Sequence, residues 1–492
     1  MDIATLEPQD VWKHFLTICS IPHPSHHEEA LASALVTWAQ GKGLSTHTDA
    51  AHNVVIRKSA SPGKERAPGI ILQAHLDMVP QAASSLGHDF AKDPIRPRID
   101  PADPAWITAT GTTLGADNGI GVAMALAILE DSSIVHGPLE CLFTTDEEDG
   151  MSGARAVEPG VLSGKILLNL DGEDDNELTI GCAGSIRTSA ELSHPTEPVG
   201  IGQSWFEVTV GGLLGGHSGV DIDKGRANAT LVLSRVITAS GIPCSLASMS
   251  GGTAANAIPR EARAIIGIGT GEEKAFRSAI EKEATAIKAE LAATDPGLVV
   301  HIAAAAKPTR RILGRAGAGS LLSVLLGMPN GLIAMEPDMP DLIRTSLNLG
   351  TLSGEVTGDV FTLKTMTLVR SSSDADKEAL GMRLESSLES ATTMGWSVSY
   401  KRQAESPAWS PNTASPLLKQ CKEVYSALFG SAPRVSSTHG GLETGLFRPK
   451  FPSWDQISLG PTIRYPHSPD ERVEIASVAR SYRFVVELLK RL

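Results

Sequence analysis

The stretch Ile70-Ile71-Leu72-Gln73-Ala74-His75-Leu76-Asp77 begins as an apolar run of strand length and ends in polar residues. Similar apolar runs recur at 139–144 and 166–170, and an apolar segment of helical length, 119–129, lies between the first two. Continuous apolar strands that alternate with helices are typical of a parallel sheet covered on both faces. The sequence therefore predicts an α/β domain with a mostly parallel central sheet.

The chain of 492 residues is too long for one ordinary domain. Its character changes after Ser185, where a polar segment with prolines, 193–200, precedes a new strand. We therefore expect a first catalytic segment at 1–185, an inserted α+β domain at 186–402, and a second catalytic segment at 403–492. The inserted block hints at an internal duplication, because two similar stretches, 248–268 and 349–369, are each followed by a predicted helix.

Composition excludes several classes of protein. The formal net charge of -13 argues against nucleic acid or an anionic membrane as the main partner. The N-terminus lacks the basic start of a signal peptide, and the longest apolar stretch is too short to span a bilayer, so we expect a cytoplasmic protein. The 5 cysteines are odd in number and show no paired spacing, which argues against a disulfide framework or a thiolate zinc finger.

Five potential metal ligands follow the apolar runs or the loops near them. Residues that leave the carboxyl ends of parallel strands meet at one crevice in an open α/β sheet. We therefore expect a metal site there. The candidate ligands are His75, Asp117, Glu148, Asp171 and His467.

Each candidate also has a simpler interpretation when it is taken alone. Asp117 opens the apolar helix, so it could be an N-cap. The acidic run Asp146-Glu147-Glu148-Asp149 could be a solvated loop. Because the run follows a buried strand, we favour a functional role, in which one Glu binds metal and its neighbour acts as general base.

Charge balance favours two divalent ions. Asp117, Glu148 and Asp171 supply three negative charges against four positive ones, which leaves one charge for a bridging hydroxide. Oxygen and imidazole ligands without thiolate suit Zn²⁺, with Mn²⁺ or Co²⁺ as substitutes. Asp77, two residues after His75, fits the role of a carboxylate that orients a ligating imidazole.

The chain resembles the di-zinc exopeptidases of the aminoacylase and carboxypeptidase type, and within them the bacterial aminoacyl-histidine dipeptidases, also called Xaa-His dipeptidases or carnosinases. The resemblance runs almost from end to end and is carried by specific motifs. They lie at 19–25 (CSIPHPS), 73–80 (QAHLDMVP), 111–121 (GTTLGADNGIG), 215–219 (GGHSG), 256–262 (NAIPREA), 460–463 (GPTI) and 467–471 (HSPDE).

The resemblance implies a zinc-exopeptidase-like catalytic domain interrupted by a lid domain, and two Zn²⁺ per chain. In that scheme His75 and Asp171 hold one zinc, Glu148 and His467 hold the other, and Asp117 bridges them. The resemblance also implies that Asp77 orients His75 and that Glu147 is the general base.

In the lid, the resemblance implies that His217 polarises the scissile carbonyl or stabilises its oxyanion. Asn256, Arg260 and Arg370 match positions that help hold the substrate or its free carboxylate, a task that suits the planar fork of Arg. Without the resemblance, we would interpret His217 as an ordinary loop residue and Arg260 as a charged surface residue. The resemblance further suggests a homodimer.

The expected function is hydrolysis of small peptides with a free C-terminal carboxylate, in particular Xaa-His dipeptides. A broader di- or tripeptidase and an N-acyl amino acid deacylase remain open, because they share the metal site. A catalytically silent binding protein on the same fold is the alternative from another class. The chain departs from its close relatives at Gly172, where they have a hydroxyl residue, and at Asp146, where they have Thr.

Overall fold

The computed structural model describes residues 2–309, 311–337 and 339–492. The chain forms two compact units. The first comprises Met1–Cys182, Trp409–Ser437 and Leu442–Leu492, and the second comprises Ala183–Ala408 and Thr438–Gly441. The division lies a few residues from the boundaries expected at 185 and 402, and the four-residue stretch Thr438–Gly441 was not expected in the second unit.

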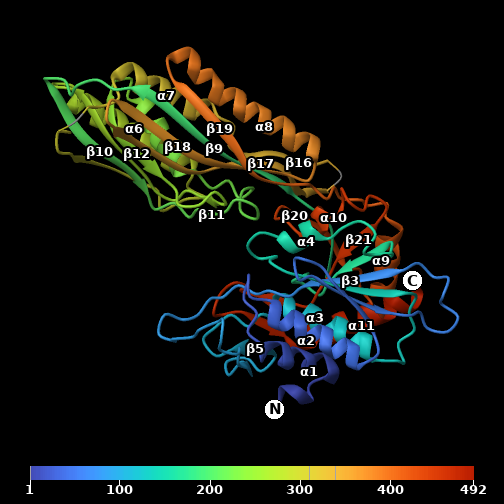
Figure 1. The fold of residues 1–492 in the computed structure, drawn as a ribbon. Helices are drawn as coiled ribbons and strands as arrows, with labels where there is room; N and C mark the ends of the chain where they lie inside the picture. The colour runs from blue at the N-terminus through green and yellow to red at the C-terminus, as the bar shows by residue number, and fades with distance from the viewer. Residues whose placement is uncertain (1, 310, 338) are drawn as a thin grey trace. The chain divides into compact units, whose positions relative to one another are not determined.

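The first unit is built on an eight-stranded sheet with the order β1-β2-β6-β3-β7-β21-β8-β20. Its strands β3, β20 and β21 are labelled in Figure 1. Its middle strands β6, β3, β7 and β21 are parallel, whereas β1, β2 and β8 join the sheet in antiparallel fashion. The bounds of the eight strands are β1 Ser45–Thr48, β2 Val54–Lys58, β3 Ile70–His75, β6 Leu139–Thr144, β7 Ile166–Asn169, β8 Glu177–Cys182, β20 Arg434–Thr438 and β21 Asp455–Ser458.

Helices pack on this sheet for reasons visible in the sequence. Helix α3 (Ala116–Glu130) is apolar all round and is buried along nearly its whole length, packed against α1 and β3. Helix α9 (Pro416–Phe429) has Ser415 as N-cap and Pro416 at its first position, and it ends at Gly430 in the left-handed region. The other helices of this unit are α1 Gln9–Cys19, α2 Glu29–Gly41, α4 Ser152–Ala156, α10 Glu443–Phe447 and α11 Ile475–Arg491.

An apolar cluster joins the sheet to the short helices α4 and α10. Ile71 of β3 and Leu142 of β6 pack there with Ala154 of α4 and Phe447 of α10. Side chains two residues apart lie on the same face of a strand, so Gln73 and His75 share this face with Ile71. A smaller sheet with the order β22-β23-β5-β4 completes the unit; its strands are β4 Pro97–Ile99, β5 Trp106–Ala109, β22 Ile463–Arg464 and β23 Arg472–Glu474.

The second unit contains one long antiparallel sheet with the order β15-β10-β14-β12-β17-β18-β9-β19, to which β16 is added beside β17. Four helices, α5 to α8, contribute to its apolar core. The strands are β9 Gly184–Pro195, β10 Gln203–Gly211, β12 Ser245–Gly251, β14 Ala262–Gly269, β15 Val299–Ala304, β16 Gly331–Glu336, β17 Met339–Thr357, β18 Val360–Ser371 and β19 Ser397–Ser406. The helices are α5 Ala229–Ala239, α6 Glu273–Glu290, α7 Arg315–Gly327 and α8 Asp374–Glu389.

The strand order of this sheet is mirrored about its centre. On one side β12 pairs with β14, which pairs with β10; on the other side β17 pairs with β18, which pairs with β9. Helix α6 follows β14 and leads to the edge strand β15, just as α8 follows β18 and leads to the edge strand β19. Each half of the sheet thus contains paired strands, a helix and an edge strand. An internal duplication of such a half would produce this arrangement.

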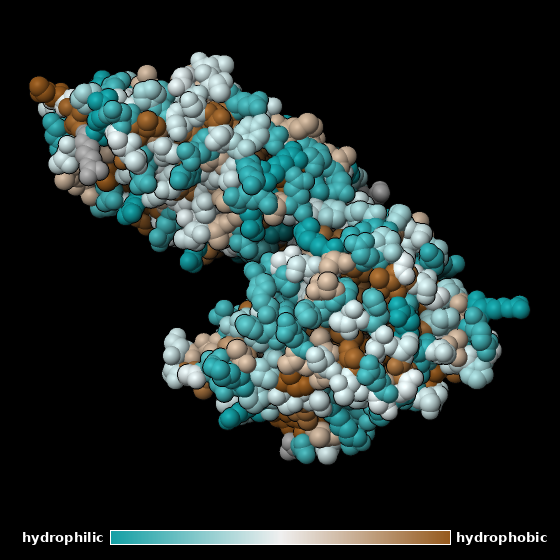
Figure 2. Space-filling model, in the orientation of Figure 1, coloured by the Kyte–Doolittle hydropathy of each residue, from teal (hydrophilic) through white to brown (hydrophobic). Residues whose placement is uncertain are grey.

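Polar side chains cover much of the visible surface, and apolar ones are scattered over both units (Figure 2). Among the described residues, no helix is both long enough and apolar enough to cross a membrane.

Candidate metal centre and substrate-binding residues

The ends of the parallel strands supply most of the candidate ligands. His75 is the last residue of β3, the pair Glu147-Glu148 follows the end of β6, and Asp171 follows the end of β7. Asp117 lies in the first turn of α3. His467 lies in the loop between β22 and β23, where its backbone takes a φ of 60°.

The first group of candidate ligands surrounds His75. Its Nε2 lies 3.1 Å from Asp117 Oδ1 and 3.2 Å from Asp171 Oδ1. The other ring nitrogen, Nδ1, donates to the backbone carbonyl of Asp77 at 3.0 Å. Because the Nδ1 proton is used in this bond, the neutral ring carries its lone pair on Nε2, toward the two carboxylates.

The second group surrounds His467. Its Nε2 lies 3.0 Å from Glu148 Oε2 and 3.4 Å from Asp117 Oδ2. Asp117 therefore turns one oxygen to each histidine and belongs to both groups. Within each group, one possible ligand atom per residue lies within 4.8 Å of the others, as it must to surround a metal ion.

The electrostatics of the site fit a pair of cations. Burial raises the pKa values of Glu148 and Asp171, and the charge of Asp117 raises both further. Glu148 Oε1 is buried and has no hydrogen-bond partner among the described residues. Crowded carboxylates, an orphaned oxygen and two imidazoles are a donor set that suits divalent metal, and the described cysteines, all buried elsewhere, add no thiolate.

The backbone around Asp117 is held from a distance by Glu471. The two carboxylate oxygens of Glu471 accept hydrogen bonds from the N–H groups of four consecutive residues, 114–117, at 2.7 to 3.3 Å. The peptide bond between Asp117 and Asn118 is cis. The Asn118 amide donates to Asp171 Oδ1, so the loop is tied to a second candidate ligand.

Asp77 contacts more than His75. Its Oδ1 lies 3.4 Å from His75 Nδ1 and also accepts the Glu147 N–H at 3.0 Å. Its Oδ2 accepts the Glu148 N–H at 3.1 Å and the Ser25 hydroxyl at 2.8 Å. Burial raises the pKa of Asp77, but the bonds to His75 and to these N–H groups outweigh it and hold the pKa at about 2.

Glu147 has the surroundings of a proton acceptor. It groups with His75 and Glu148 in space. Burial, and then the charges of Asp171 and Glu148, raise its pKa well above the ordinary value, although His75 opposes them. A carboxylate whose pKa is raised toward neutrality is a better general base at pH 7 than an ordinary one.

In the second unit, His217 has a fixed tautomer. It lies in the short strand β11 (Gly216–His217), which pairs with β13 (Ala257–Ile258). The backbone N–H groups of Gly219 and Val220 donate to its Nδ1 at 3.2 and 3.4 Å. The proton of the neutral ring is therefore on Nε2, which is a donor. Burial and the charge of Arg370 lower the pKa of His217, so the ring is neutral at pH 7.

Arg370 lies in β18 without an acidic partner among the described residues. Its Nη1 donates to the His439 carbonyl at 3.4 Å, and its Nε is buried with no hydrogen-bond partner. Its cross-strand neighbour Ser346 bonds His439 Nε2 at 2.8 Å. Burial lowers the pKa of Arg370 to about 10. A buried guanidinium with free donors is a natural site for an anion.

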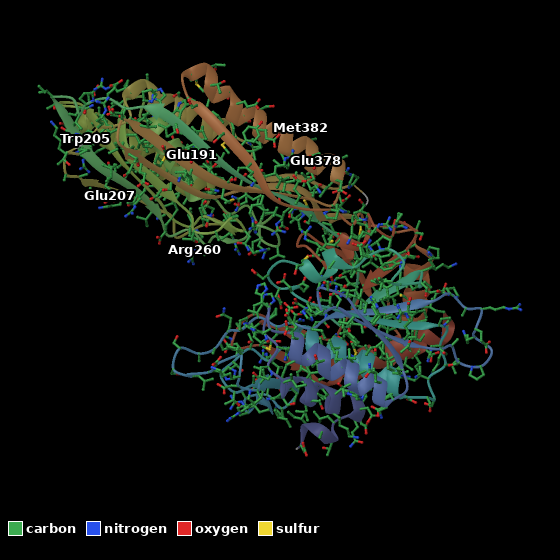
Figure 3. All side chains as sticks on the ribbon, viewed as in Figure 1. Glu191, Trp205, Glu207, Arg260, Glu378 and Met382 are labelled. Carbon is green, nitrogen blue, oxygen red and sulfur yellow. The ribbon has the colours of Figure 1, made fainter. Side chains whose placement is uncertain are left out.

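Asn256 and Arg260 differ from Arg370 in being exposed. The Asn256 carbonyl accepts the Ser218 N–H at 2.8 Å, which fixes it beside the His217 loop. Arg260, labelled in Figure 3, lies over Gly215, next to β11. It lines a cavity of about 880 Å³ within the second unit. The structure thus brings Asn256 close to His217, and it places Arg260 on an open surface.

The two departures from close relatives have structural consequences. A side chain at Gly172 would lie 2.6 Å from the Gly460 nitrogen, so a hydroxyl residue there needs a backbone shift. Asp146 has a φ of 54°, and its Oδ2 accepts bonds from the backbone and hydroxyl of Ser152. Its carboxylate is thus used to shape the loop that carries Glu147 and Glu148.

Comparison with known proteins points to the same class of protein as the sequence motifs. The sequence pattern of Peptidase family M20/M25/M40 matches residues 71–491. The chain belongs to this peptidase family. It is 40% identical over 495 residues to the cytosol non-specific dipeptidase of Escherichia coli (strain K12), covering 100% of this chain and 99% of that protein.

Solved structures of the family show the same architecture. The aminoacylhistidine dipeptidase from Vibrio alginolyticus matches with a TM-score of 0.90 and 37% identity over 100% of this chain and 98% of that one. A tripeptidase from Staphylococcus aureus shares the fold, with a TM-score of 0.61 at 15% identity over 99% of this chain and 98% of that one. The zinc-exopeptidase-like α/β fold expected from the sequence is therefore confirmed.

Sequence reasoning missed three residues that shape these sites: Glu471, His439 and Glu443. Glu471 and Glu443 act through bonds to residues far away in the chain, and such pairings leave no local pattern. Glu471 does fall in the motif at 467–471, which was the one available signal. His439 lies in a stretch that was assigned no role.

Proposed function

We propose that this chain hydrolyses dipeptides, with a preference for Xaa-His, at a centre of two divalent metal ions, zinc in the native protein. The observation that carries the proposal is the position of Asp117, which turns one oxygen to His75 and the other to His467. Membership of a peptidase family and full-length likeness to two dipeptidases support this function.

In the proposed arrangement His75 and Asp171 hold one ion, Glu148 and His467 hold the other, and Asp117 is shared. Bound ions supply Lewis acidity, which polarises a carbonyl and lowers the pKa of water. Glu147, beside His75 and Glu148, takes the proton of the attacking water and passes it to the leaving amine. Asp77 holds the backbone of Glu147 and Glu148 during both transfers.

His217 acts as a hydrogen-bond donor to the scissile carbonyl of the substrate. Its Nδ1 is occupied by two backbone N–H groups, so Nε2–H is the group that remains to donate. A neutral donor of fixed orientation stabilises charge that develops on the carbonyl oxygen without reorganisation.

Arg370 binds the free C-terminal carboxylate of the dipeptide. Its buried guanidinium lacks an acidic partner among the described residues, and a carboxylate can accept two parallel bonds from it. Asn256 and Arg260 assist from the exposed side. The need for a free C-terminal carboxylate favours exopeptidase action on short substrates over cleavage within long chains.

A broader range of dipeptides is the second candidate function. It is favoured by the name of the Escherichia coli relative, a cytosol non-specific dipeptidase. The same name supports a cytoplasmic location for this chain. We also propose a homodimer, which size-exclusion chromatography with light scattering would test.

A substrate panel tests the proposal. The metal-free protein is reconstituted with zinc, and release of the C-terminal amino acid is measured for Xaa-His dipeptides, other dipeptides, tripeptides and N-acetyl amino acids. We expect rapid cleavage of dipeptides, fastest for Xaa-His, and none after chelation. Equal rates for all dipeptides would support the broader function. Cleavage of N-acetyl amino acids alone, or of no substrate, would overturn the proposal.

A further inference from the structure

A buried carboxylate with no cationic partner in the described parts of the chain lies beside the strands that carry the candidate ligands. Glu443, the first residue of α10, is 1% exposed. No Lys, Arg or His among the described residues lies within ion-pair distance of it. Burying an uncompensated charge is costly, so a Glu at this position requires an explanation beyond packing.

Glu443 belongs to a network of fully buried polar side chains. Its Oε2 accepts bonds from Gln73 Nε2 at 2.5 Å and from Thr144 Oγ1 at 2.7 Å. Gln73 Nε2 also lies 3.1 Å from Thr144 Oγ1, and Gln73 Oε1 accepts a bond from Asn169 Nδ2 at 2.6 Å. These four residues link the ends of three strands and the start of α10.

The network lies next to the residues that the site depends on. Gln73 is two residues before His75 in β3, and Asn169 ends β7 two residues before Asp171. Thr144 ends β6, before the Glu147-Glu148 pair, and it is the register partner of His75. A shift in the network would therefore move candidate ligands of both ions.

The hydrogen-bond directions favour a charged Glu443. Both donors converge on Oε2, whereas Oε1 is buried without a partner among the described residues. A protonated carboxyl would place its O–H either at Oε1, where no acceptor lies among the described residues, or at Oε2, donating to Thr144 Oγ1. In the second case the Thr144 hydroxyl would be left with the Ala74 carbonyl, at 3.4 Å, as its acceptor, which is a weaker bond. Burial raises the pKa of Glu443 to about 8, with His75 acting in the opposite direction, so the ionised form needs positive charge nearby.

We propose that Glu443 is a positioning residue that holds the ends of β3 and β6 through Gln73 and Thr144 and supplies a negative charge that strengthens metal binding at the neighbouring centre. This inference rests on the proposed metal centre. Partners outside the ligand set of a metal site commonly change metal affinity by about 10- to 100-fold.

The test compares three proteins for zinc affinity, measured by competition with a chromophoric chelator, and for thermal unfolding of the metal-free form. Glu443→Gln retains an oxygen acceptor and removes the charge. Glu140→Gln is the matched control, because Glu140 is a buried carboxylate of the same sheet, in β6, that already has Arg57 as partner at 3.2 Å.

We expect Glu443→Gln to bind zinc about 10- to 100-fold more weakly than wild type, while the metal-free protein unfolds at the same or a higher temperature. Glu140→Gln should keep wild-type zinc affinity and unfold at a lower temperature. Wild-type zinc affinity in Glu443→Gln would overturn the inference, and so would a loss of affinity that merely follows a loss of metal-free stability.

A second variant separates charge from hydrogen bonding. Thr144→Val removes one donor to Glu443 and leaves its carboxylate in place, so we expect a smaller loss of zinc affinity than in Glu443→Gln. An equal or larger loss would contradict the role of the charge. If wild type itself fails to bind two zinc ions, the proposed function fails; if it binds two and Glu443→Gln is unaffected, only this inference fails.

Discussion

The backbone N–H of Glu147 donates to Asp77 Oδ1 at 3.0 Å. The other oxygen of Asp77 accepts the next N–H, that of Glu148, at 3.1 Å. One carboxylate beside His75 thus fixes the backbone of both the proposed base and a proposed ligand. The position of the proposed base therefore depends on Asp77 as well as on the strand that precedes it.

Replacing Asp77 by Asn should lower kcat by about 10- to 100-fold, because an amide offers one acceptor oxygen where two are used. Zinc stoichiometry after reconstitution should remain at two. Asp10→Asn, on the exposed face of α1, is the control and should retain the wild-type rate. Unchanged turnover in Asp77→Asn would show that the two N–H bonds have no role in placing Glu147.

The lowered pKa of Asp77 predicts how the free energy of unfolding depends on pH. Its pKa is lowered from 3.8 to about 2 in the folded chain. It therefore contributes stability that is fully present above about pH 4 and is lost as the pH falls through about 2. The shift corresponds to roughly 2 kcal/mol. Urea unfolding of metal-free protein at a series of pH values should show this loss in wild type and not in Asp77→Asn; parallel curves would contradict it.

Glu471 should be a stabilising residue, since it accepts four backbone N–H bonds at the start of α3. Glu471→Gln should lower the free energy of unfolding by about 3 kcal/mol, the value of hydrogen bonds to a buried charge. Denaturant titration measures this change. Asp470→Asn, the exposed neighbour, should have no effect. A Glu471→Gln protein as stable as wild type would mean that water replaces the lost acceptor.

His217→Ala should lower kcat by about 100- to 1,000-fold, the usual cost of removing one donor to a developing oxyanion. Zinc content should not change, because His217 belongs to the second unit and is not a proposed ligand. His301→Ala, an exposed histidine of β15, serves as the control. A His217→Ala protein with wild-type kcat would exclude the proposed donor role.

Arg370→Met should raise KM for dipeptides about 100-fold, or about 3 kcal/mol, through loss of a charged hydrogen bond to the substrate carboxylate. Dipeptide amides, which lack that carboxylate, should be cleaved equally poorly by both proteins. Arg383→Met on α8 is the control. Because Arg370 has no acidic partner in the described part of the chain, its replacement should not lower the free energy of unfolding. A normal KM would refute the assignment.

The candidate ligands could be named from the sequence because His75, Asp117, Glu148 and Asp171 lie near buried apolar runs, and such runs can be recognised locally. His467 lies in a loop and falls in the motif at 467–471. The structure brings His75, Asp117, Glu148, Asp171 and His467 into two groups that share Asp117. One neighbouring element was also predictable: the apolar segment of helical length at 119–129 lies within α3 Ala116–Glu130.

The residues that support the ligands were not predictable in the same way. Glu471 bonds to residues more than 350 positions earlier, and Glu443 bonds to Gln73 and Thr144. In the sequence both look like ordinary surface acids, because burial of a charge is decided by partners that only the fold brings near. The tautomer of His217 likewise depends on two backbone N–H groups that no pattern indicates.

The central claim is that Glu147 moves the proton in a metal-dependent dipeptide hydrolysis. Its most direct test is the turnover number of Glu147→Gln on an Xaa-His dipeptide, with zinc content measured on the same sample. The account predicts two zinc ions per chain and a kcat lowered by about 100- to 10,000-fold. A Glu147→Gln protein that carries two zinc ions and turns over at nearly the wild-type rate would contradict it.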